Sequence, residues 1–436
     1  YANTIIFSET GTLYSDITKE PFNVVPYAPI YYLISATFIS LFGKSLFFGR
    51  LISIICSLLV SFLVYKIVFT ITKRRNVSMM AGLLLFTSNI TFYWGILFKP
   101  DLLALFFIVL GIYFVVKYIK NKQVVNLYAS VIIFLVAFFT KQDSITAPLA
   151  TFIYLCMTNK DHAKKFIVSF LIGGTTIFLI AYFLSSGYFY LHIVKYAAHV
   201  GFALIGTISL FYLFINENFI MLFLAFSVFF VIKKSERSEE INFFIIYIVV
   251  SLLLLLIRTS RMGSNLNYFL EFLVISAIIT GYVTFYLSKL KEGRGIFIMS
   301  IFVMIILQIF SGVVSTLLYE EPSINLFEKI NKIYLSNENL KENISKFIPE
   351  EGEILVEDSS LAVNKNKKIL FSDPFMLYLI EKGGDWNSSI LIEKCNAKEF
   401  SFIAYEDRFE WFEGFEECLK NYNKVNYSAH FKIYVK

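Results

Sequence analysis

The sequence predicts a polytopic α-helical membrane protein with a small α/β domain at its C-terminal end. Hydrophobic residues make up 57% of the 436 residues and the mean hydropathy is +0.66, whereas soluble domains are about 45–50% apolar. Charged residues lie in short clusters between apolar runs as far as residue 318 and become frequent from Glu320 onward. The net charge of +6 belongs mostly to loop residues, so it does not indicate a nucleic-acid partner.

About ten apolar runs are long enough to be membrane spans, because a helix needs about 20 residues to cross a bilayer. They cover residues 46–72, 76–98, 101–119, 124–140, 143–158, 165–185, 217–232, 240–257, 266–288 and 295–317.

The cations in the connections between these runs alternate. Every second connection carries about three, and cytoplasmic loops are enriched in Lys and Arg. These connections hold Lys73, Arg74 and Arg75; Lys117, Lys120 and Lys122; Lys160, Lys164 and Lys165; Lys233, Lys234 and Arg237; and Lys289, Lys291 and Arg294. The other connections hold Lys99, Lys141, Lys195, and the pair Arg258 and Arg261. The first set is therefore predicted to be cytoplasmic, and both chain ends are predicted to lie outside.

Two shorter apolar runs, residues 29–42 and 202–215, are predicted to be interfacial helices on the outer surface. Each has about 14 residues, which suits a helix lying in the interface better than a span. Pro26 and Pro29 mark the start of the first helix. The alternative is that either run is a short tilted span.

Residues 320–436 alternate short strands with helices and are predicted to form the α/β domain, with residues 1–319 as the membrane domain. The expected strands are 353–357, 368–371, 401–405 and 431–435, and the expected helices are 374–382 and 388–397. Counting the predicted spans from the cytoplasmic loops predicts that this domain is extracytoplasmic. Of the four cysteines, Cys395 and Cys418 lie in it and are able to pair in an oxidising compartment.

The unusual polar residues gather at the outer ends of the predicted spans, which locates any chemistry at the outer membrane interface. Asp101 follows Lys99 and Pro100 at the start of a span. One interpretation is a helix N-cap. The other is a carboxylate that binds a divalent cation, beside a lysine that either holds a phosphate or anchors the helix in the interface.

A second group consists of Lys141, Gln142 and Asp143, and a third of Arg258 and Arg261. Two arginines on the side that is poor in cations indicate an anionic partner, either lipid headgroups or a specific phosphate. Among the residues after these arginines, Glu271 is a rare acid inside a span, and pairing with an arginine is its expected role. In the loop 186–200, His192 is a candidate ligand or acid–base group.

Several blocks of the sequence resemble GT-C glycosyltransferases of the protein O-mannosyltransferase and aminoarabinose transferase type. They lie in order along essentially the whole chain: Glu9 to Asp16, Pro26 to Tyr32, Gly49 to Ser53, Lys99-Pro100-Asp101, Thr140-Lys141-Gln142, Gly263 to Glu271, Val356-Glu357-Asp358 and Ser372 to Phe375.

The resemblance implies a transferase that uses a polyprenyl- or dolichyl-phosphate-linked sugar at the outer membrane face, with a protein, lipid or glycan as acceptor. Asp101 matches the second acidic position of the family. The primary acid and the first membrane helix are expected upstream of Tyr1. The implied phosphate-binding residues are Lys99, Lys141, Arg258 and Arg261. Tyr14, Gln142, Asn265, Asn267, Tyr268 and Glu271 line the substrate groove, and Asp101 and His192 are the candidate ligands of a divalent metal, Mg²⁺ or Mn²⁺.

Three other functions are alternatives to the transferase. A transporter is typically built from inverted repeats with interrupted helices at mid-membrane, and the sequence contains neither. A non-catalytic scaffold, whose C-terminal domain binds other envelope components, is an alternative that the sequence leaves open. So is a polysaccharide or O-antigen ligase with a diphosphate donor, because nothing in the sequence distinguishes its glycan acceptor from a protein.

Overall fold

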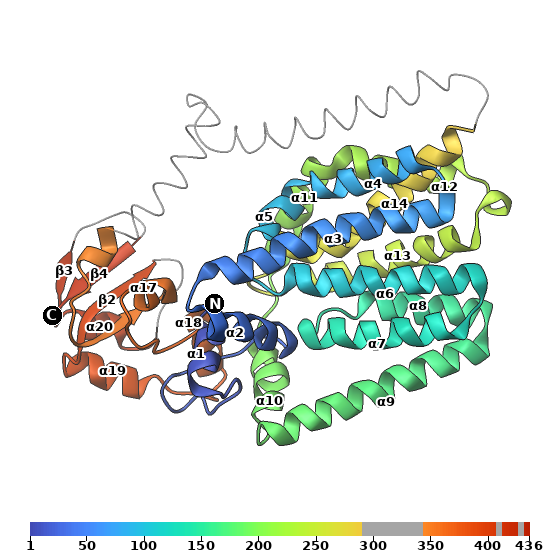
Figure 1. Cartoon of the computed structure of the whole chain (residues 1–436). Coiled ribbons are helices and arrows are strands. Elements are labelled where there is room, and N and C mark those ends of the chain that lie inside the picture. The colour runs from blue at the N-terminus through green and yellow to red at the C-terminus, as the bar shows by residue number, and fades with distance from the viewer. Residues whose placement is uncertain (290–342, 407–411, 426–430) are drawn as a thin grey trace, which may run out of the picture.

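The computed structural model describes residues 1–289, 343–406, 412–425 and 431–436 as a helical bundle with a small mixed α/β unit at one end (Figure 1). The predicted span 295–317, Lys291, Arg294 and the predicted domain boundary at residues 319–320 lie outside the described residues. The coarser part of the predicted fold class, a mainly helical protein with a small α/β unit near its C-terminal end, is confirmed.

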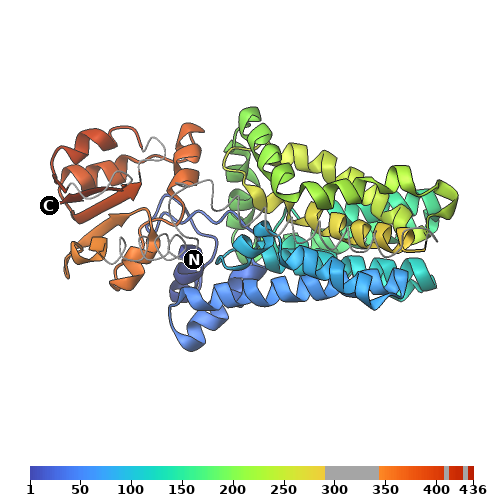
Figure 2. The same ribbon diagram turned by 90° about the horizontal axis from the view of Figure 1, so that it is seen from above.

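The bundle consists of apolar helices, most of them long, that lie side by side (Figures 1 and 2). They are α3 (Leu46–Thr72), α4 (Arg75–Phe86), α5 (Asn89–Gly95), α6 (Asp101–Asn121), α7 (Val124–Thr140), α8 (Thr146–Thr158), α9 (Lys160–Leu184), α11 (Leu204–Phe226), α12 (Val228–Val231), α13 (Glu239–Thr259) and α14 (Leu270–Leu287). Within the described chain, six helical stretches are long and apolar enough to cross a membrane. The bent pair α4 and α5 makes a seventh if it counts as one span.

The difference from about ten predicted spans has a local cause. The runs at 124–140 and 143–158 form helices of 17 and 13 residues, short for a bilayer. The run at 76–98 is broken by a 61° bend between α4 and α5. All four helices nevertheless lie in the bundle with the longer ones (Figure 1).

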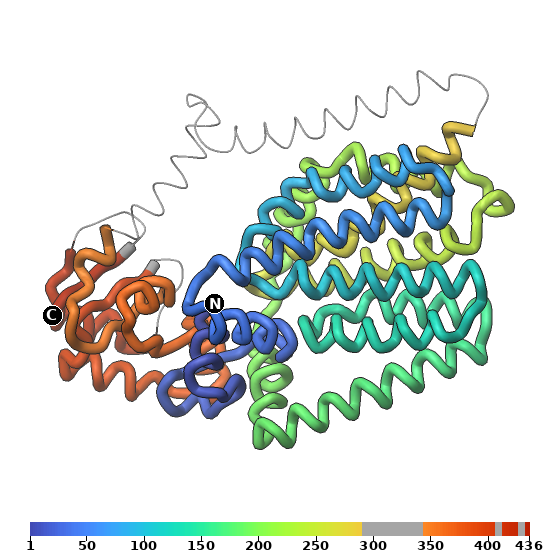
Figure 3. The backbone as a smooth tube through the Cα atoms, in the orientation of Figure 1, coloured from blue at the N-terminus to red at the C-terminus, as the bar shows by residue number. Residues whose placement is uncertain are grey.

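Successive bundle helices run in opposite directions, so their connections fall at two ends (Figure 3). The start of α6, the α7–α8 turn, the loop before α11 and the α13–α14 turn share one end, and the α/β unit sits there as well (Figure 1). The four cation-rich connections that are fully described, those with Lys73, Lys120, Lys160 and Lys233, lie at the other end (Figure 1). The alternation predicted from the loop charges therefore matches the arrangement of the helices.

Residues 202–215 were predicted to be a separate interfacial helix, and the structure corrects this. They form the first half of α11, which continues past a kink at Asn218. The Asn218 side chain donates a hydrogen bond to the Phe214 carbonyl (3.0 Å), so the polar sequence around residue 217 marks a bend within one helix. Residues 29–42, in contrast, do form a separate helix, α2 (Ile30–Phe42), packed against α1 (Ala2–Thr10).

The α/β unit contains a four-stranded sheet in the order β1-β2-β4-β3. Its strands are β1 (Glu353–Val356), β2 (Phe400–Glu406), β3 (Asn423–Val425) and β4 (Phe431–Val435), and its helices are α17 (Ser359–Asn364), α18 (Pro374–Lys382), α19 (Ser389–Asn396) and α20 (Phe415–Leu419). Strand β1 is parallel to β2, and the other pairs are antiparallel. The strand predicted at 368–371 is reduced to an isolated bridge between Phe371 and Phe22. Cys395 and Cys418 form a disulfide between α19 and α20.

The α/β unit shares its hydrophobic core with loops of the membrane part. Phe22 and Val24 from the segment before α2 are buried in the same cluster as Leu377 of α18. The Phe22 amide also donates to the Leu370 carbonyl (2.7 Å). The unit is thereby packed against the end of the bundle where the polar residues gather.

Candidate functional site

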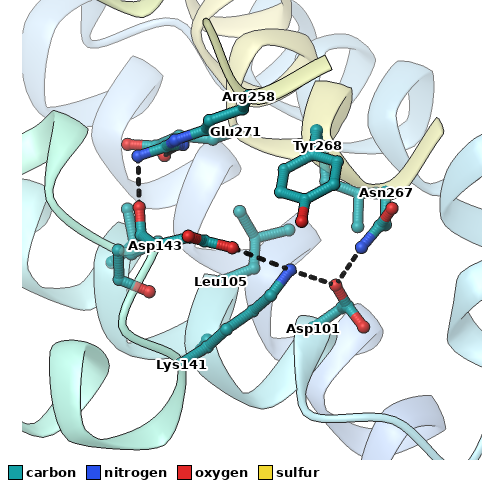
Figure 4. A pocket seen from close by; sticks show the side chains of 12 residues that line it. Asp101, Leu105, Lys141, Asp143, Arg258, Asn267, Tyr268 and Glu271 are labelled. Carbon is teal, nitrogen blue, oxygen red and sulfur yellow. Dashed lines mark hydrogen bonds and ion pairs between the residues drawn. The ribbon is translucent and has the colours of Figure 1, made fainter. Parts of the chain in front are cut away.

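A small pocket lies at this end of the bundle, between α6, the α7–α8 turn, α13 and α14 (Figure 4). Its lining residues are Asp101, Ala104, Leu105, Ile108, Lys141, Asp143, Ser144, Arg258, Asn267, Tyr268, Leu270 and Glu271. Half of these were candidate site residues from the sequence. The structure brings them together from four separate segments because the helix ends that carry them meet at one face.

Asp101 and Lys141 form a buried ion pair in the pocket. Lys141 Nζ lies 2.8 Å from Asp101 Oδ1, and the exposed fractions of the two side chains are 7% and 3%. Asn267 Nδ2 donates to the same oxygen at 2.7 Å. The Asp101 side chain thus pairs with side chains of other segments, and within the described chain it makes no capping hydrogen bond to α6.

The charge of Lys141 is held by its surroundings. Burial alone lowers the pKa of its ammonium group, but the carboxylates of Asp101 and Asp143 more than offset this and raise the pKa above its ordinary value. The ammonium also lies over the ring of Tyr268, 4.7 Å from its centroid. Lys141 is therefore a fixed positive charge in the pocket.

Two buried oxygens beside this pair have no hydrogen-bond partner among the described residues, Oδ2 of Asp101 and Oδ1 of Asn267. Buried polar atoms are nearly always hydrogen-bonded, so each is able to accept a hydrogen bond from a bound molecule. Both atoms are acceptors, which suits a hydroxyl, an amine or water.

A second ionic group completes the pocket. Arg258 Nη1 lies 3.7 Å from Glu271 Oε2, and Arg258 Nη2 donates to the backbone carbonyl of Asp143. The phenol of Tyr247 donates to Glu271 Oε1. The predicted pairing of Glu271 with an arginine is present.

The remaining predicted residues lie outside the pocket lining. Arg261 Nη2 donates to the Ala197 carbonyl at 2.7 Å and so ties two loops together. Lys99 Nζ lies 4.8 Å from the ring centroid of Trp94. Asn265 accepts a hydrogen bond from the Leu266 amide at the start of a short 3-10 helix, Leu266–Phe269.

Tyr14 and Gln142 both bind the backbone of the segment before α2. The Tyr14 hydroxyl donates to the Tyr27 carbonyl (2.9 Å), and Gln142 Nε2 donates to the Pro26 carbonyl (2.7 Å). Their observed contacts hold this segment over the helix ends.

Both ring nitrogens of His192 are engaged by backbone groups. Nδ1 accepts from the Val25 amide at 3.1 Å, and Nε2 lies 2.8 Å from the Ser15 carbonyl, to which it donates. Burial lowers the pKa of His192 to about 4, so the ring is neutral at pH 7. This arrangement leaves neither nitrogen for a metal and fits a structural role.

The described residues do not fit a preformed metal centre. They contain no group of three His, Cys, Asp or Glu side chains arranged to hold an ion. In the pocket, Asp101 Oδ1 is engaged by two donors, and its Oδ2 is the oxygen without a partner. We therefore derive no catalytic step through a metal.

Sequence reasoning missed Tyr247 and Ser144, and it noted Asp143 without assigning it to the site. Asp143 stands two residues after Lys141, which is a signal that was available. Tyr247 gives no signal, because a tyrosine among phenylalanines in an apolar helix reads as ordinary core.

Comparison with known proteins gives one family match and several structural ones. The family model described as dolichyl-phosphate-mannose-protein mannosyltransferase matches residues 26–186. No curated protein matches the chain by sequence. The crystal structure of ArnT from Cupriavidus metallidurans bound to undecaprenyl phosphate superposes with a TM-score of 0.66 at 10% identity, covering 99% of this chain and 92% of that one.

The apo state of the same ArnT gives a TM-score of 0.60 at 10% identity, with 99% and 91% coverage. The Archaeoglobus fulgidus oligosaccharyltransferase, in complex with Zn and sulfate, gives 0.50 at 12% identity and covers all of this chain and 68% of that one. Identities this low establish a shared fold. The resemblance predicted from the sequence is confirmed: the chain is a multi-pass membrane protein with the GT-C glycosyltransferase fold.

Proposed function

We propose that this protein is a membrane glycosyltransferase that moves a sugar from a polyprenyl-phosphate or dolichyl-phosphate donor to an acceptor at the outer membrane face. The observation that carries the proposal is the convergence of Asp101, Lys141 and Arg258 in one pocket at the ends of the spans. A donor of this kind keeps its hydrocarbon chain in the bilayer while its phosphate lies at the span ends.

The pocket supplies what such a reaction needs. The bond between the sugar's anomeric carbon and the phosphate oxygen breaks, and negative charge develops on the leaving phosphate. Lys141 and Arg258 would stabilise that charge, because preorganised cations in a site shielded from water act strongly. The acceptor's hydroxyl oxygen forms the new bond to the anomeric carbon and loses its proton to a base.

Asp101 is the pocket carboxylate suited to the acceptor side. Its Oδ2 has no partner among the described residues, so it can accept the hydrogen bond of an acceptor hydroxyl and orient it. Its Oδ1 pairs with Lys141. A divalent cation, Mg²⁺ or Mn²⁺, remains a proposal that would require further ligands from the substrates.

Two observations support an outer location for the pocket and for the α/β unit. The connections at this end are the ones poor in Lys and Arg. The Cys395–Cys418 disulfide belongs to an oxidising compartment. We accordingly propose that residues 1–319 form the membrane domain and residues 320–436 an extracytoplasmic domain.

The ArnT structure that matches this fold was solved with undecaprenyl phosphate bound, which supports the same class of donor here. The test is to incubate the full-length protein in lipid nanodiscs with radiolabelled polyprenyl-phosphate sugars and cell-envelope acceptors. Transfer is expected for the wild type, and its absence with every donor would favour a transporter or a scaffold.

Asp101→Asn is expected to abolish transfer while the protein stays folded in the membrane, because Asp143 Oδ2, 3.9 Å from Lys141 Nζ, still faces the buried cation. The matched control is Asp161→Asn, because Asp161 lies in the first turn of α9, at the opposite end of the bundle. Activity retained by Asp101→Asn would remove Asp101 from the mechanism.

A further inference from the structure

Glu271 is a buried acid held between two groups of another helix. It is 6% exposed at the start of α14. Its Oε1 accepts from the Tyr247 phenol, and its Oε2 faces the Arg258 guanidinium. The Thr146 side chain at the start of α8 also hydrogen-bonds to this carboxylate. An isolated buried charge is strongly disfavoured, so these three partners account for the presence of a carboxylate here.

Tyr247 and Arg258 both belong to α13 and point the same way. They are eleven residues apart, which is about three helical turns or about 16 Å along the axis. Side chains with this spacing lie on one face of a helix. The phenol reaches toward one end of Glu271 and the guanidinium toward the other, so the carboxylate bridges the two.

Among the residues that the structure describes, the Tyr247 hydroxyl has no hydrogen-bond partner besides Glu271. Tyr247 is fully buried, and its ring packs near Phe243 on the same helix. Phenylalanine would serve the packing equally well. The hydrogen bond to Glu271 is what distinguishes tyrosine from phenylalanine at this position.

Arg258 is the pocket cation whose ion pair is loose. Its Nη1 is 3.7 Å from Glu271 Oε2, whereas Lys141 is 2.8 Å from Asp101. Glu271 Oε1 accepts the hydrogen bond from Tyr247, and Oε2 is the oxygen that pairs with the guanidinium. The ion pair is therefore made through one carboxylate oxygen. The guanidinium is held by Glu271 and the Asp143 carbonyl, and it lines the pocket (Figure 4).

We propose that Tyr247 and Glu271 are positioning residues that aim Arg258 at an anionic group in the pocket; this rests on the proposed function, in which that group is the donor phosphate. Tyr247 hydrogen-bonds to one oxygen of Glu271. The other oxygen orients the guanidinium at 3.7 Å without forming a close ion pair. Without the phenol, Glu271 keeps only Thr146 and Arg258 as partners, so it is expected to pair more closely with Arg258 and to neutralise more of the charge that would bind the ligand.

The test is the binding of undecaprenyl phosphate to the full chain in nanodiscs. Tyr247→Phe is expected to raise Kd about 10-fold, the effect of losing a hydrogen bond to a charged group. The matched control is Tyr154→Phe. Tyr154 is also buried, touches Phe243 of α13, and has a hydroxyl without a partner among the described residues. Its Kd is expected to stay within about twofold of wild type.

A double-mutant cycle separates positioning from a general packing effect. In an Arg258→Gln background, adding Tyr247→Phe is expected to change Kd no further, since the cation it acts through is gone. An unchanged Kd for Tyr247→Phe, or the same 10-fold loss in both backgrounds, overturns the proposal.

A wild type that does not bind undecaprenyl phosphate would instead contradict the proposed function. The positioning is then tested without a ligand, by the rate at which phenylglyoxal modifies Arg258, read by peptide mass spectrometry. Tyr247→Phe is expected to change this rate at Arg258 and to leave Arg237 unchanged, and Tyr154→Phe is expected to change neither. Equal rates at Arg258 in wild type and Tyr247→Phe would overturn the positioning itself.

Discussion

Lys141 and Asp101 are 40 residues apart in the sequence, yet Nζ and Oδ1 lie 2.8 Å apart in a nearly fully buried ion pair. Asp101 opens α6 and Lys141 directly follows α7. These helices are antiparallel neighbours that pack against each other in the bundle (Figure 1). The pair is therefore part of how the ends of α6 and α7 are joined.

Lys141→Met is expected to destabilise the protein by about 3–5 kcal/mol, because it leaves Asp101 as a buried charge without its cation. The double variant Asp101→Asn with Lys141→Met is expected to recover most of this loss. Thermal unfolding in detergent measures both. A double variant no more stable than Lys141→Met would contradict the assignment.

His192 is expected to make the stability of the loops that it joins, around Ser15, Val25 and residues 186–200, depend on pH. Its pKa is about 4 in the folded protein, against 6.5 for an unperturbed histidine. Above pH 6.5 both states are neutral and the residue has no effect. Below pH 6.5 the unfolded chain binds a proton at His192 and the folded protein does not. The free energy of unfolding therefore falls as the pH is lowered to about 4.

The expected loss between pH 7 and pH 5 is about 2 kcal/mol, from 1.36 kcal/mol per pKa unit. Melting temperatures at the two pH values measure it. In His192→Asn, which keeps an acceptor for the Val25 amide but does not titrate, this pH dependence is expected to shrink. An identical pH dependence in wild type and variant would assign it to another group.

The sequence was sufficient to predict which polar residues lie at one end of the bundle, because the alternating loop charge indicates the direction of each helix. Asp101, Lys141 and Arg258 were expected at one end and share one pocket. The sequence did not show that Arg258 lines the pocket and Arg261 does not. The two are three residues apart, but α13 ends at Thr259, so the second arginine belongs to a turn whose direction the helix period does not set.

The sequence also failed to predict the kink in α11 and the role of Tyr247, for physical reasons. Hydropathy measures how apolar a segment is, and it does not show a bend. The kink at Asn218 therefore looked like the end of one helix and the start of another. Tyr247 acts through a single hydroxyl in an aromatic helix, and no sequence pattern marks which tyrosine meets a buried acid.

Gly111 allows α6 and α7 to approach closely. A Cβ added at this position would lie 2.4 Å from the ring of Phe134, which is fully buried. Gly111→Ala is expected to destabilise the bundle by about 1–3 kcal/mol, the cost of overpacking a filled core. Thermal unfolding measures the change.

Gly174→Ala is the matched control for this substitution. Its added Cβ would meet Leu135 Cδ2 at 3.5 Å, an ordinary contact. Its effect is expected to be small, because a helix also gains from replacing Gly by Ala. Equal destabilisation by the two variants would argue against close packing of α6 on α7.

The disulfide between Cys395 and Cys418 closes a loop across the α/β unit with a sequence separation of 23. Replacing both cysteines by serine is expected to destabilise this unit by about 3 kcal/mol, mainly because the unfolded chain is no longer constrained. Limited proteolysis of the purified protein, with fragments read by mass spectrometry, measures the change. Cys56→Ser, in a buried position of α3 outside any disulfide, is the control.

The same bond tests on which side of the membrane the pocket lies. Alkylating free thiols in intact cells before extraction is expected to leave Cys395 and Cys418 joined in one cross-linked peptide, because export exposes them to an oxidising compartment. The cytosol keeps thiols reduced, so alkylation of both cysteines would place the α/β unit inside. Because that unit shares a buried cluster with Phe22 and Val24 at the pocket end of the bundle, the pocket would then also open to the cytoplasm, and transfer at the outer face would be excluded.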